Sequence, residues 1–382
     1  MSSKWILYIG GFELPDKNAA AQRVLSNAKA FKSLGYNVFF VGLSQNAVNE
    51  VQTYEGFEYI NYPYPKSAKD WFYYLTSIKQ LSEHLDRMPN FVVAYNYPAL
   101  ALNRLRKWTL RKKISLIADC TEWYESKGSL LFRLIKSFDT FYRMEKVHPK
   151  LDGIIAISRY LYTYYSPKIE NIIEIPPLVD LSMGKWGHIS YKENYKNSIE
   201  IIYAGSPGKG NKDRLDVVIE ALSQIKKEKS NFTLKIIGVS EGEYNSLFNK
   251  EVPVNIKENI VFKGRLSHTD TLTEIKKAHF SLFLRDNNLA NRAGFPTKFV
   301  ESVSAGTPVL TNSTSNLQDF IVHGKTGILL NFDSLESLKK DLENAICQTG
   351  EDISLMKGFC YNSQIFDYRK YTIQFAKLIN DL

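Results

Sequence analysis

The sequence predicts an α/β protein made of two consecutive doubly wound domains. Short apolar strands alternate with helical stretches along residues 1–180, and the same alternation begins again at residue 199. A polar, glycine-containing stretch over residues 181–198 separates the two series and is the expected linker. The 382 residues suffice for two domains with a core each. Because ligands bind at the carboxyl ends of strands in such sheets, we expect the two domains to face each other across a cleft.

The first domain, residues 1–180, is expected to contain a parallel sheet covered by helices. Short apolar runs predict strands over residues 6–9, 38–41, 57–62, 91–95, 115–118 and 153–156. Helical stretches fill the intervals over residues 19–34, 69–85, 100–111 and 130–147. Gly35 follows the first of these helices, as is typical of a helix end.

The second domain, residues 199–364, repeats the pattern. Its strands are predicted over residues 199–204, 233–237, 259–262, 281–284, 308–311 and 328–330. Helical stretches are predicted over residues 215–227, 271–278 and 335–346. The tail over residues 365–382 is also helical in pattern, with four candidate anchors in Phe366, Tyr371, Phe375 and Leu378.

Composition indicates a soluble globular protein, with 44% hydrophobic and 23% charged residues. No apolar run has the roughly eighteen residues that span a bilayer. The three cysteines, Cys120, Cys347 and Cys360, lack the spacing of metal ligands and are an odd number, which is typical of reduced thiols in the cytoplasm. We therefore expect a cytoplasmic protein.

The positive charge is concentrated in the first half. Residues 1–190 carry 24 Lys and Arg against 17 Asp and Glu, and the whole chain has a net charge of +9. The densest run, over residues 104–113, holds six Lys and Arg around Trp108. Such a run can be a solvated helix face, or it can bind an anionic membrane surface or a lipid-linked phosphate acceptor; both interpretations stay open. No nucleic-acid-binding motif accompanies the charge, so nucleic acid is not an expected partner.

Residues 291–310 are the most informative segment. Pro296 suits the first turn of a helix, and Gly306 suits its end. A helix start that carries Arg292 and Lys298 can hold an anion, because free N–H groups and two cations point at it. Glu301 lies one turn further on, where its carboxylate can accept hydrogen bonds from ribose hydroxyls. These groups together predict a clamp for a sugar nucleotide.

The same segment resembles the donor-binding signature of the retaining glycosyltransferases of family 4, which have the GT-B fold of two Rossmann-like domains. The residues that carry the resemblance are Gly294, Phe295, Glu301, Ala305, Gly306, Pro308 and Val309. Ala293 stands where many members have a first glutamate. A subset of the family reads Pro-x-Lys-x-x-Glu instead, and Pro296, Thr297, Lys298 and Glu301 match that version.

The resemblance implies an activity. A sugar would pass from a nucleoside-diphosphate sugar, UDP- or GDP-linked, to an acceptor hydroxyl with retention. The resemblance also implies that Lys298 is catalytic and that the last helix, residues 365–382, crosses back onto the first domain. The positive charge of the first half favours a precursor of a cell-envelope or capsular polysaccharide as the acceptor, and a soluble acceptor or a protein glycan stays open. No Asp-x-Asp motif occurs in the chain, so we expect cations rather than a metal ion to stabilise the diphosphate, and no cofactor.

Two further turns of the second domain are candidates for donor contacts. The turn over residues 204–214 contains Gly205, Ser206, Lys209 and Lys212, and it is either a diphosphate cradle or a surface turn. Within the resemblance, Lys212 matches the family lysine. Arg265 follows Gly264 at a strand end and could reach a phosphate or base, or belong to a simple loop.

The first domain offers two turns of its own. Gly10 and Gly11 could bring the backbone close to the donor phosphates, with Arg23 supporting them from the next helix, or they could serve the turn alone. Asp119 and Glu122 follow a strand end, where catalytic groups collect in such sheets. Either carboxylate could orient the acceptor hydroxyl or merely cap the following helix.

Two rival functions stay open. A nucleotide-sugar epimerase on this fold would need acid and base groups facing the sugar, and no such set is identified in the sequence. A non-catalytic subunit that binds a sugar nucleotide or a glycan is the second rival, and Ala293 in place of the first glutamate keeps it open.

Overall fold

The computed structural model describes residues 4–15, 18–48, 50–67, 88–123, 130–187, 198–207, 212–226 and 231–382. The chain forms two compact units. The first comprises Met1–Val179, Arg292–Phe295 and Phe366–Leu382, and the second comprises Asp180–Asn291 and Pro296–Ile365. The helix predicted over residues 69–85 lies outside the described residues, as does most of the predicted linker.

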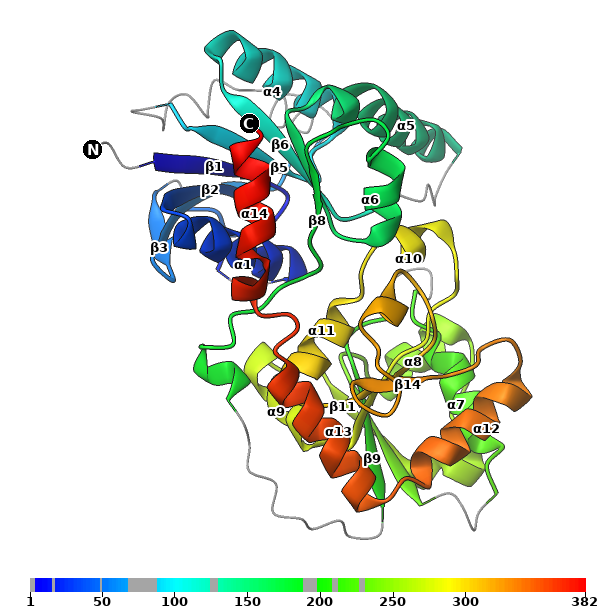
Figure 1. Ribbon diagram of the computed structural model, residues 1–382. Helices are drawn as coiled ribbons and strands as arrows, with labels where there is room; N and C mark the ends of the chain where they lie inside the picture. Colours follow the sequence, from blue (N-terminus) through cyan, green and yellow to red (C-terminus); the bar gives the residue numbers. More distant parts are fainter. Residues whose placement is uncertain are drawn as a thin grey trace. The chain divides into compact units, whose positions relative to one another are not determined.

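The sheet of the first unit has the strand order β3-β4-β2-β1-β5-β6-β7-β8 (Figure 1). The strands are β1 (Lys4–Gly10), β2 (Tyr36–Ser44), β3 (Gln52–Tyr54), β4 (Phe57–Pro63), β5 (Phe91–Tyr95), β6 (Ser115–Cys120), β7 (Gly153–Ala156) and β8 (Ile172–Glu174). Every pair is parallel except the edge pair of β3 and β4. The order reverses between β1 and β5, which is the switch point of a doubly wound sheet.

Helices fill the connections between these strands. They are α1 (Ala19–Ser33), α4 (Ala99–Lys112), α5 (Leu130–Phe141), a π-helix (Tyr142–Val147), a 3-10 turn (His148–Lys150), α6 (Arg159–Tyr165), a second 3-10 turn (Tyr368–Tyr371) and α14 (Thr372–Asn380). The stretch predicted as one helix over residues 130–147 is thus α5 continued by a π-helix. The C-terminal α14 lies against α1, where the rings of Phe31 and Phe375 meet at 4.9 Å.

The sheet of the second unit has the strand order β11-β10-β9-β12-β13-β14, and all its pairs are parallel. Its strands are β9 (Ile199–Ala204), β10 (Phe232–Ile237), β11 (Ile260–Gly264), β12 (Phe280–Leu282), β13 (Val309–Thr311) and β14 (Gly327–Leu329). Its α-helices are α7 (Leu215–Ser223), α8 (Glu241–Phe248), α9 (His268–Lys277), α11 (Thr297–Ser304), α12 (Leu335–Ile346) and α13 (Gly350–Ser363). The short helix α10 (Leu289–Ala293) begins in this unit, and its last two residues belong to the first unit's segment Arg292–Phe295. Short 3-10 turns cover Gly184–Trp186, Val254–Asn259 and Leu317–Asp319.

The strand order of the second unit places its switch point between β9 and β12. At such a point the two neighbouring strands lead into helices on opposite faces, which leaves room beyond their carboxyl ends. Gly205 is the first residue after β9, and Arg285 lies shortly after the end of β12. The predicted α/β class with parallel doubly wound sheets is therefore confirmed, and the chemistry of the second unit is expected at this edge.

Candidate active site

A buried ion-pair cluster occupies the switch point of the second unit. Lys298 extends from the first turn of α11 toward the end of β9, where its Nζ pairs with the carboxylate of Asp213. The same Nζ donates a hydrogen bond to the hydroxyl of Tyr203 at 2.8 Å and lies 4.2 Å from the centre of that ring. The side chain of Lys298, which was predicted to act on the donor, therefore reaches the end of β9.

Asp213 is the centre of this cluster. Its carboxylate also accepts hydrogen bonds from Arg285 Nε at 2.7 Å and from the Tyr203 hydroxyl at 2.9 Å. The side chain is 2% exposed. Burial alone would raise its pKa, but the adjacent Lys298 and Arg285 outweigh burial and lower the pKa of Asp213 from 3.8 to about 2. The carboxylate is therefore ionised, and two cations share one anion.

Glycine at position 205 makes room for the lysine. Gly205 has a φ of +132°, which side chains with a Cβ rarely adopt, and a Cβ there would lie 2.8 Å from Lys298 Nζ and even closer to its Cε. Gly238, after β10, also approaches closely, because its Cβ would meet the carbonyl of Gly205 at 2.5 Å. Two glycines at neighbouring strand ends therefore open the space that the Lys298 side chain crosses.

The cluster carries surplus positive charge at a place with limited access to water. Lys298 is 14% exposed and Arg285 is 8% exposed. Burial lowers the pKa of Lys298, while the neighbouring Asp213 opposes that change. With one carboxylate between two cations, the arrangement is suited to receiving a further anion, such as a diphosphate.

Glu301 lies one turn after Lys298 on α11. Its Oε1 is 3.4 Å from Nε2 of His268, the first residue of α9. The ring of His268 in turn lies edge-on to Trp186, with 6.5 Å between ring centres. Glu301 is 19% exposed, so it reaches solvent at the edge of the lysine cluster and can accept hydrogen bonds from a polar ligand.

The remaining residues predicted to bind the donor in the second unit lie at its surface or next to α11. Ser206 and Lys212 are exposed, Pro296 is the residue before α11, and Thr297 is half-buried in its first turn. Arg265 is 73% exposed and pairs with Glu243 at 2.6 Å. Lys209 lies outside the described residues.

Arg292, Gly294 and Phe295, also predicted to bind the donor, group with the first unit. The guanidinium of Arg292 lies 5.7 Å from the ring centre of Tyr160. Gly294 and Phe295 are buried, and the ring of Phe295 lies 6.2 Å from that of Phe366.

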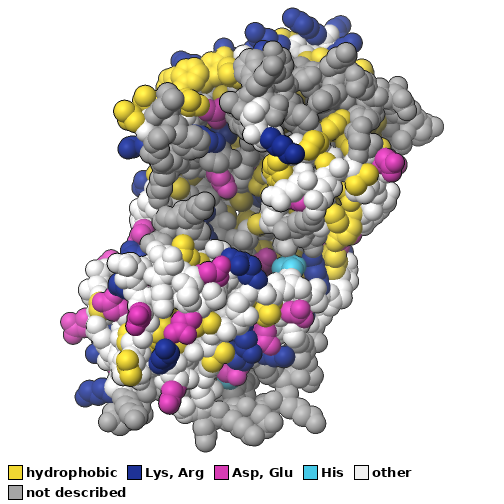
Figure 2. Space-filling view, turned by 180° about the vertical axis from the view of Figure 1, so that it is seen from behind, with side chains coloured by type: hydrophobic (Ala, Val, Ile, Leu, Met, Phe, Trp, Pro, Cys, Tyr) yellow, Lys and Arg dark blue, Asp and Glu magenta, His cyan; other side chains and the backbone are white. Residues whose placement is uncertain are grey.

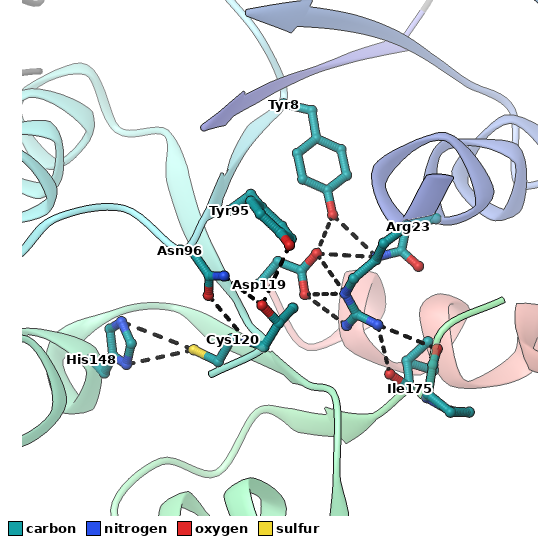
Figure 3. Close-up of polar contacts among 11 residues, drawn as sticks. Tyr8, Arg23, Tyr95, Asn96, Asp119, Cys120, His148 and Ile175 are labelled. Carbon is teal, nitrogen blue, oxygen red and sulfur yellow. Dashed lines mark hydrogen bonds and ion pairs between the residues drawn. The ribbon is translucent and has the colours of Figure 1, made fainter. Parts of the chain in front are cut away.

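Asp119 in the first unit is the centre of a second buried network (Figure 3). Its carboxylate accepts hydrogen bonds from Tyr8 at 2.6 Å, from Arg23 at 2.7 and 3.0 Å, and from Asn27 at 3.3 Å. Arg23 also donates to the carbonyl oxygen of Ile175 at 3.0 Å. The network joins β1, α1, β6 and the chain that leaves β8.

This placement does not fit the predicted roles of Asp119 and Arg23. Asp119 is 0% exposed and Arg23 is 3% exposed, so neither side chain meets solvent in this structure, and both are fully engaged with each other and their neighbours. An ion pair this deep fixes the positions of α1 and β6 rather than contacting an acceptor hydroxyl or a phosphate. Glu122, by contrast, is exposed.

Gly10, the last residue of β1, and Gly11, the residue after it, differ from each other. Gly10 is buried, and a Cβ there would lie 2.7 Å from Cβ of Tyr95 on β5. Gly11 is exposed, and a Cβ there would have no neighbour within 4 Å. Gly10 is therefore required by strand packing, whereas the backbone at Gly11 is open to a ligand.

The described residues were also considered as possible metal ligands. Over the residues the structure describes, no group of three or more His, Cys, Asp or Glu could hold a metal ion. The expectation that the site uses cations instead of a metal therefore stays a prediction.

Comparison with known proteins bears on the same part of the chain. Residues 191–352, which include Tyr203, Asp213, Arg285, Lys298 and Glu301, match the family of glycosyl transferases group 1. The match covers less than half of the chain. An uncharacterized glycosyltransferase of Methanocaldococcus jannaschii is 24% identical over 232 residues, 57% of this chain and 58% of that protein. The chain thus matches little more than half the length of this curated relative. Together these matches support the prediction of a glycosyltransferase.

Solved structures share the fold of the whole chain. Sucrose-phosphate synthase from Thermosynechococcus elongatus superposes with a TM-score of 0.71 at 13% identity, over 99% of this chain and 98% of that one. HepE of Anabaena, crystallised with UDP-glucose, superposes with a TM-score of 0.67 at 13% identity, over 99% of this chain and 100% of that one. The predicted GT-B fold is confirmed.

Three members of the Lys298 cluster were not predicted from sequence. Tyr203 lies inside a strand, Asp213 is an isolated acid in a basic turn, and Arg285 begins a polar loop. The position of Arg285 just beyond a predicted strand was an available signal, because strand ends at a switch point collect ligand-binding groups. The pairing of Asp213 with Lys298 joins residues 85 positions apart, and no local pattern shows it.

Proposed function

We propose that this protein is a glycosyltransferase that moves a sugar from a nucleoside-diphosphate sugar to an acceptor hydroxyl with retention. The observation that carries the proposal is the cluster of Lys298, Arg285 and Asp213 at the switch point of the segment that matches glycosyl transferases group 1. It combines surplus positive charge, low exposure and an adjacent carboxylate on α11, which are the properties a diphosphate and a ribose require.

In this proposal the donor's diphosphate lies beside Lys298 and the first turn of α11. The N-terminal N–H groups of that helix and the Lys298 ammonium attract the phosphate oxygens. Lys212, exposed in the turn after β9, adds a further cation. Glu301 accepts hydrogen bonds from the ribose hydroxyls, because its carboxylate lies one turn from the lysine and reaches solvent.

The chemical step demands stabilisation of negative charge. The bond between the sugar's C1 and the phosphate oxygen breaks, and its electron pair stays on the leaving diphosphate. The acceptor oxygen forms a new bond to C1 on the same face, and its proton passes to a leaving phosphate oxygen. Lys298, held in place by Asp213 and Tyr203, stabilises the charge that develops on the diphosphate without reorganisation.

Turnover tests the proposal. The purified chain is assayed with UDP-, GDP-, ADP- and dTDP-sugars without added metal, and release of the nucleoside diphosphate is measured. One donor class is expected to be hydrolysed slowly, and Lys298→Ala is expected to lower the rate about 100-fold, the usual effect of removing one transition-state charge contact. Lys340→Ala, an exposed lysine on α12, is the matched control and should leave the rate unchanged.

Two outcomes would count against the proposal. Release from none of the four donor classes would favour a binding subunit, the rival that Ala293 keeps open. Equal rates for the wild type and Lys298→Ala would remove the lysine cluster from the mechanism.

For the acceptor, we propose a precursor of a cell-envelope or capsular polysaccharide. The support is the excess of positive charge in the first 190 residues, which contain 24 Lys and Arg and 17 Asp and Glu. Such an excess favours an acceptor that carries phosphate groups. A screen with phosphate-bearing lipid-linked sugars against neutral soluble sugars separates this acceptor class from others.

A further inference from the structure

Helix α5 in the first unit has five apolar side chains on the outside. Leu130, Leu134, Phe138 and Phe141 are 72%, 61%, 60% and 55% exposed, and Ile135 is 59% exposed. At 100° per residue, positions 130, 134, 138 and 141 fall on one face of the helix. A helix on the surface of a globular domain normally has the opposite arrangement.

Two polar residues of α5 are turned toward the rest of the unit. Asp139 accepts a hydrogen bond from the backbone N–H of Ala99 at 2.9 Å, which caps the first turn of α4, and Thr140 is 5% exposed. Just beyond α5, the hydroxyl of Tyr142 accepts a hydrogen bond from Asn103 of α4 at 3.1 Å. These contacts fix the rotation of α5, so the outward position of its apolar face is a property of the packed unit.

The helix that packs beside α5 carries exposed cations. The neighbouring α4 and the residue after it carry Arg104, Arg106, Lys107, Arg111, Lys112 and Lys113, of which all but Arg106 are exposed. Leu110, among them, is 69% exposed. Arg133 of α5 is also exposed. Figure 2 shows hydrophobic side chains gathered at the upper left, the side on which α5 lies, with Lys and Arg side chains along the upper edge.

We infer that the α4–α5 surface, defined as the exposed apolar side chains of α5 and the cations of α4, docks onto an anionic lipid bilayer. Apolar side chains at helical spacing can enter the interface between headgroups and acyl chains, while the adjacent cations meet anionic headgroups. No helix in the described parts of the chain has the length and apolarity to cross a bilayer, and this docking does not require one.

Charge favours a lipid surface over a second copy of this chain. A two-fold dimer through α5 would bring each copy's α4 cations toward the same cations of its partner, because such an interface uses one patch twice. Like charges brought together in this way oppose association, whereas an anionic surface attracts every one of them. The surface area of Leu and Phe exposed on α5 supplies the attraction that charge alone lacks.

Vesicle sedimentation tests this inference with the full chain. The probes are large vesicles of phosphatidylglycerol mixed with phosphatidylcholine, and vesicles of phosphatidylcholine alone. The wild type should bind the mixed vesicles and bind the neutral ones at least about tenfold more weakly. The double variant Leu134→Ser/Phe138→Ser should weaken binding to the mixed vesicles about tenfold or more, because both side chains are largely exposed and their removal leaves the fold intact.

Lys107→Gln/Arg111→Gln is a second, independent variant. It should weaken binding about 30-fold, following the usual contribution of each cation near an anionic surface. The matched controls are Ile373→Ser, an apolar residue that is 81% exposed on α14, and Lys226→Gln/Lys340→Gln, two exposed lysines of the second unit. Both controls should bind like the wild type, and circular dichroism checks that each variant is folded.

Three results would overturn the inference. The first is equal binding to neutral and anionic vesicles, or none to either. The second is wild-type binding by both α4–α5 variants. The third is a wild-type dimer in solution that Leu134→Ser/Phe138→Ser converts to a monomer without any change in vesicle binding, which would assign the face to self-association. None of these measurements depends on transferase turnover.

Discussion

Asp213 holds two cations, Lys298 and Arg285, while its own side chain is only 2% exposed. Removing the negative charge leaves both cations in a poorly hydrated place without compensation. We therefore expect Asp213→Asn to lower the free energy of unfolding by about 3 kcal/mol, as found for broken buried ion pairs. Urea unfolding near neutral pH measures this change. The matched control is Asp286→Asn. The Asp286 side chain pairs with Arg214 at the surface and is 47% exposed, so this pair should contribute less than about 1 kcal/mol to the free energy of unfolding.

The same carboxylate gives an expected pH dependence. The folded pKa of Asp213 is lowered from 3.8 to about 2, so its ionised form contributes stability that is fully present above pH 3.8. As pH falls from about 4 toward 2 the carboxylate is protonated, and about 2 kcal/mol should be lost. The difference in unfolding free energy between wild type and Asp213→Asn should narrow over this interval. A constant difference down to the lowest pH would contradict the assignment.

Gly205 makes a second prediction at the residue scale. In Gly205→Ala, the new Cβ would collide with the Lys298 side chain in a backbone conformation that alanine rarely adopts. We expect a loss of about 1 to 3 kcal/mol in unfolding free energy, measured by urea unfolding. Gly242→Ala on α8 is the control, because no atom would lie within 4 Å of the new Cβ. The higher helix propensity of alanine should leave the free energy of unfolding unchanged or slightly raised. Equal effects of the two substitutions would show that Lys298 does not occupy this space.

At the scale of elements, α4 depends on a side chain from α5. The residue before α4, Pro98, has no capping side chain, and Asp139 accepts the hydrogen bond from Ala99 instead. We expect Asp139→Ala to cost about 1 kcal/mol of unfolding free energy, the usual value for a lost helix cap. Arg133→Ala, an exposed residue on the same helix, should change stability by less than about 0.5 kcal/mol. A neutral Asp139→Ala would mean that solvent replaces this cap without loss.

Sequence periodicity located most elements but not their orientation. The strands predicted over 91–95, 153–156 and 199–204 have the bounds of β5, β7 and β9, because buried parallel strands are compact apolar runs between polar turns. The edge strand β3 and the short strand β8 were not predicted, because three residues are too few to show the hydrophobic pattern of a strand. The stretch over 130–147 was recognised as helical, yet five apolar side chains of its first part, α5, lie exposed on the surface, whereas Met144 and Val147 in its last part are buried. Periodicity gives the face of a helix but not what that face meets.

The candidate site was predictable to a similar extent. Lys298 and Glu301 could be predicted as site residues, because a lysine at a helix start and an acid one turn later form a pattern within a few residues of sequence. Asp119 was assigned to the acceptor because it lies at a strand end, and Arg23 was assigned to the donor because its helix follows a glycine turn. Each is instead the other's buried partner from 96 residues away. Contacts of that range depend on how strands are ordered in the sheet, and one sequence does not show it.

At the scale of the whole molecule, two units with separate cores should respond differently to the donor. A ligand that binds only the second unit stabilises that unit, by about 2.7 kcal/mol at one hundred times its Kd. Trp186 is the one tryptophan of five that lies outside residues 1–179, so its fluorescence reports the second unit. Comparing the wild type with Trp186→Phe during thermal unfolding isolates this signal. We expect the donor to delay the Trp186 transition; an equal delay in the signal that remains in Trp186→Phe would contradict a donor site built from the second unit.

The most direct test of the Lys298 cluster is calorimetric titration of nucleoside diphosphates into the wild type and Lys298→Ala. The account predicts that one of UDP, GDP, ADP or dTDP binds the wild type, and that Lys298→Ala weakens its affinity about tenfold or more, the contribution of a charge-assisted hydrogen bond to phosphate. Equal affinity in both proteins, or no binding of any of the four, would contradict the placement of the donor at this cluster.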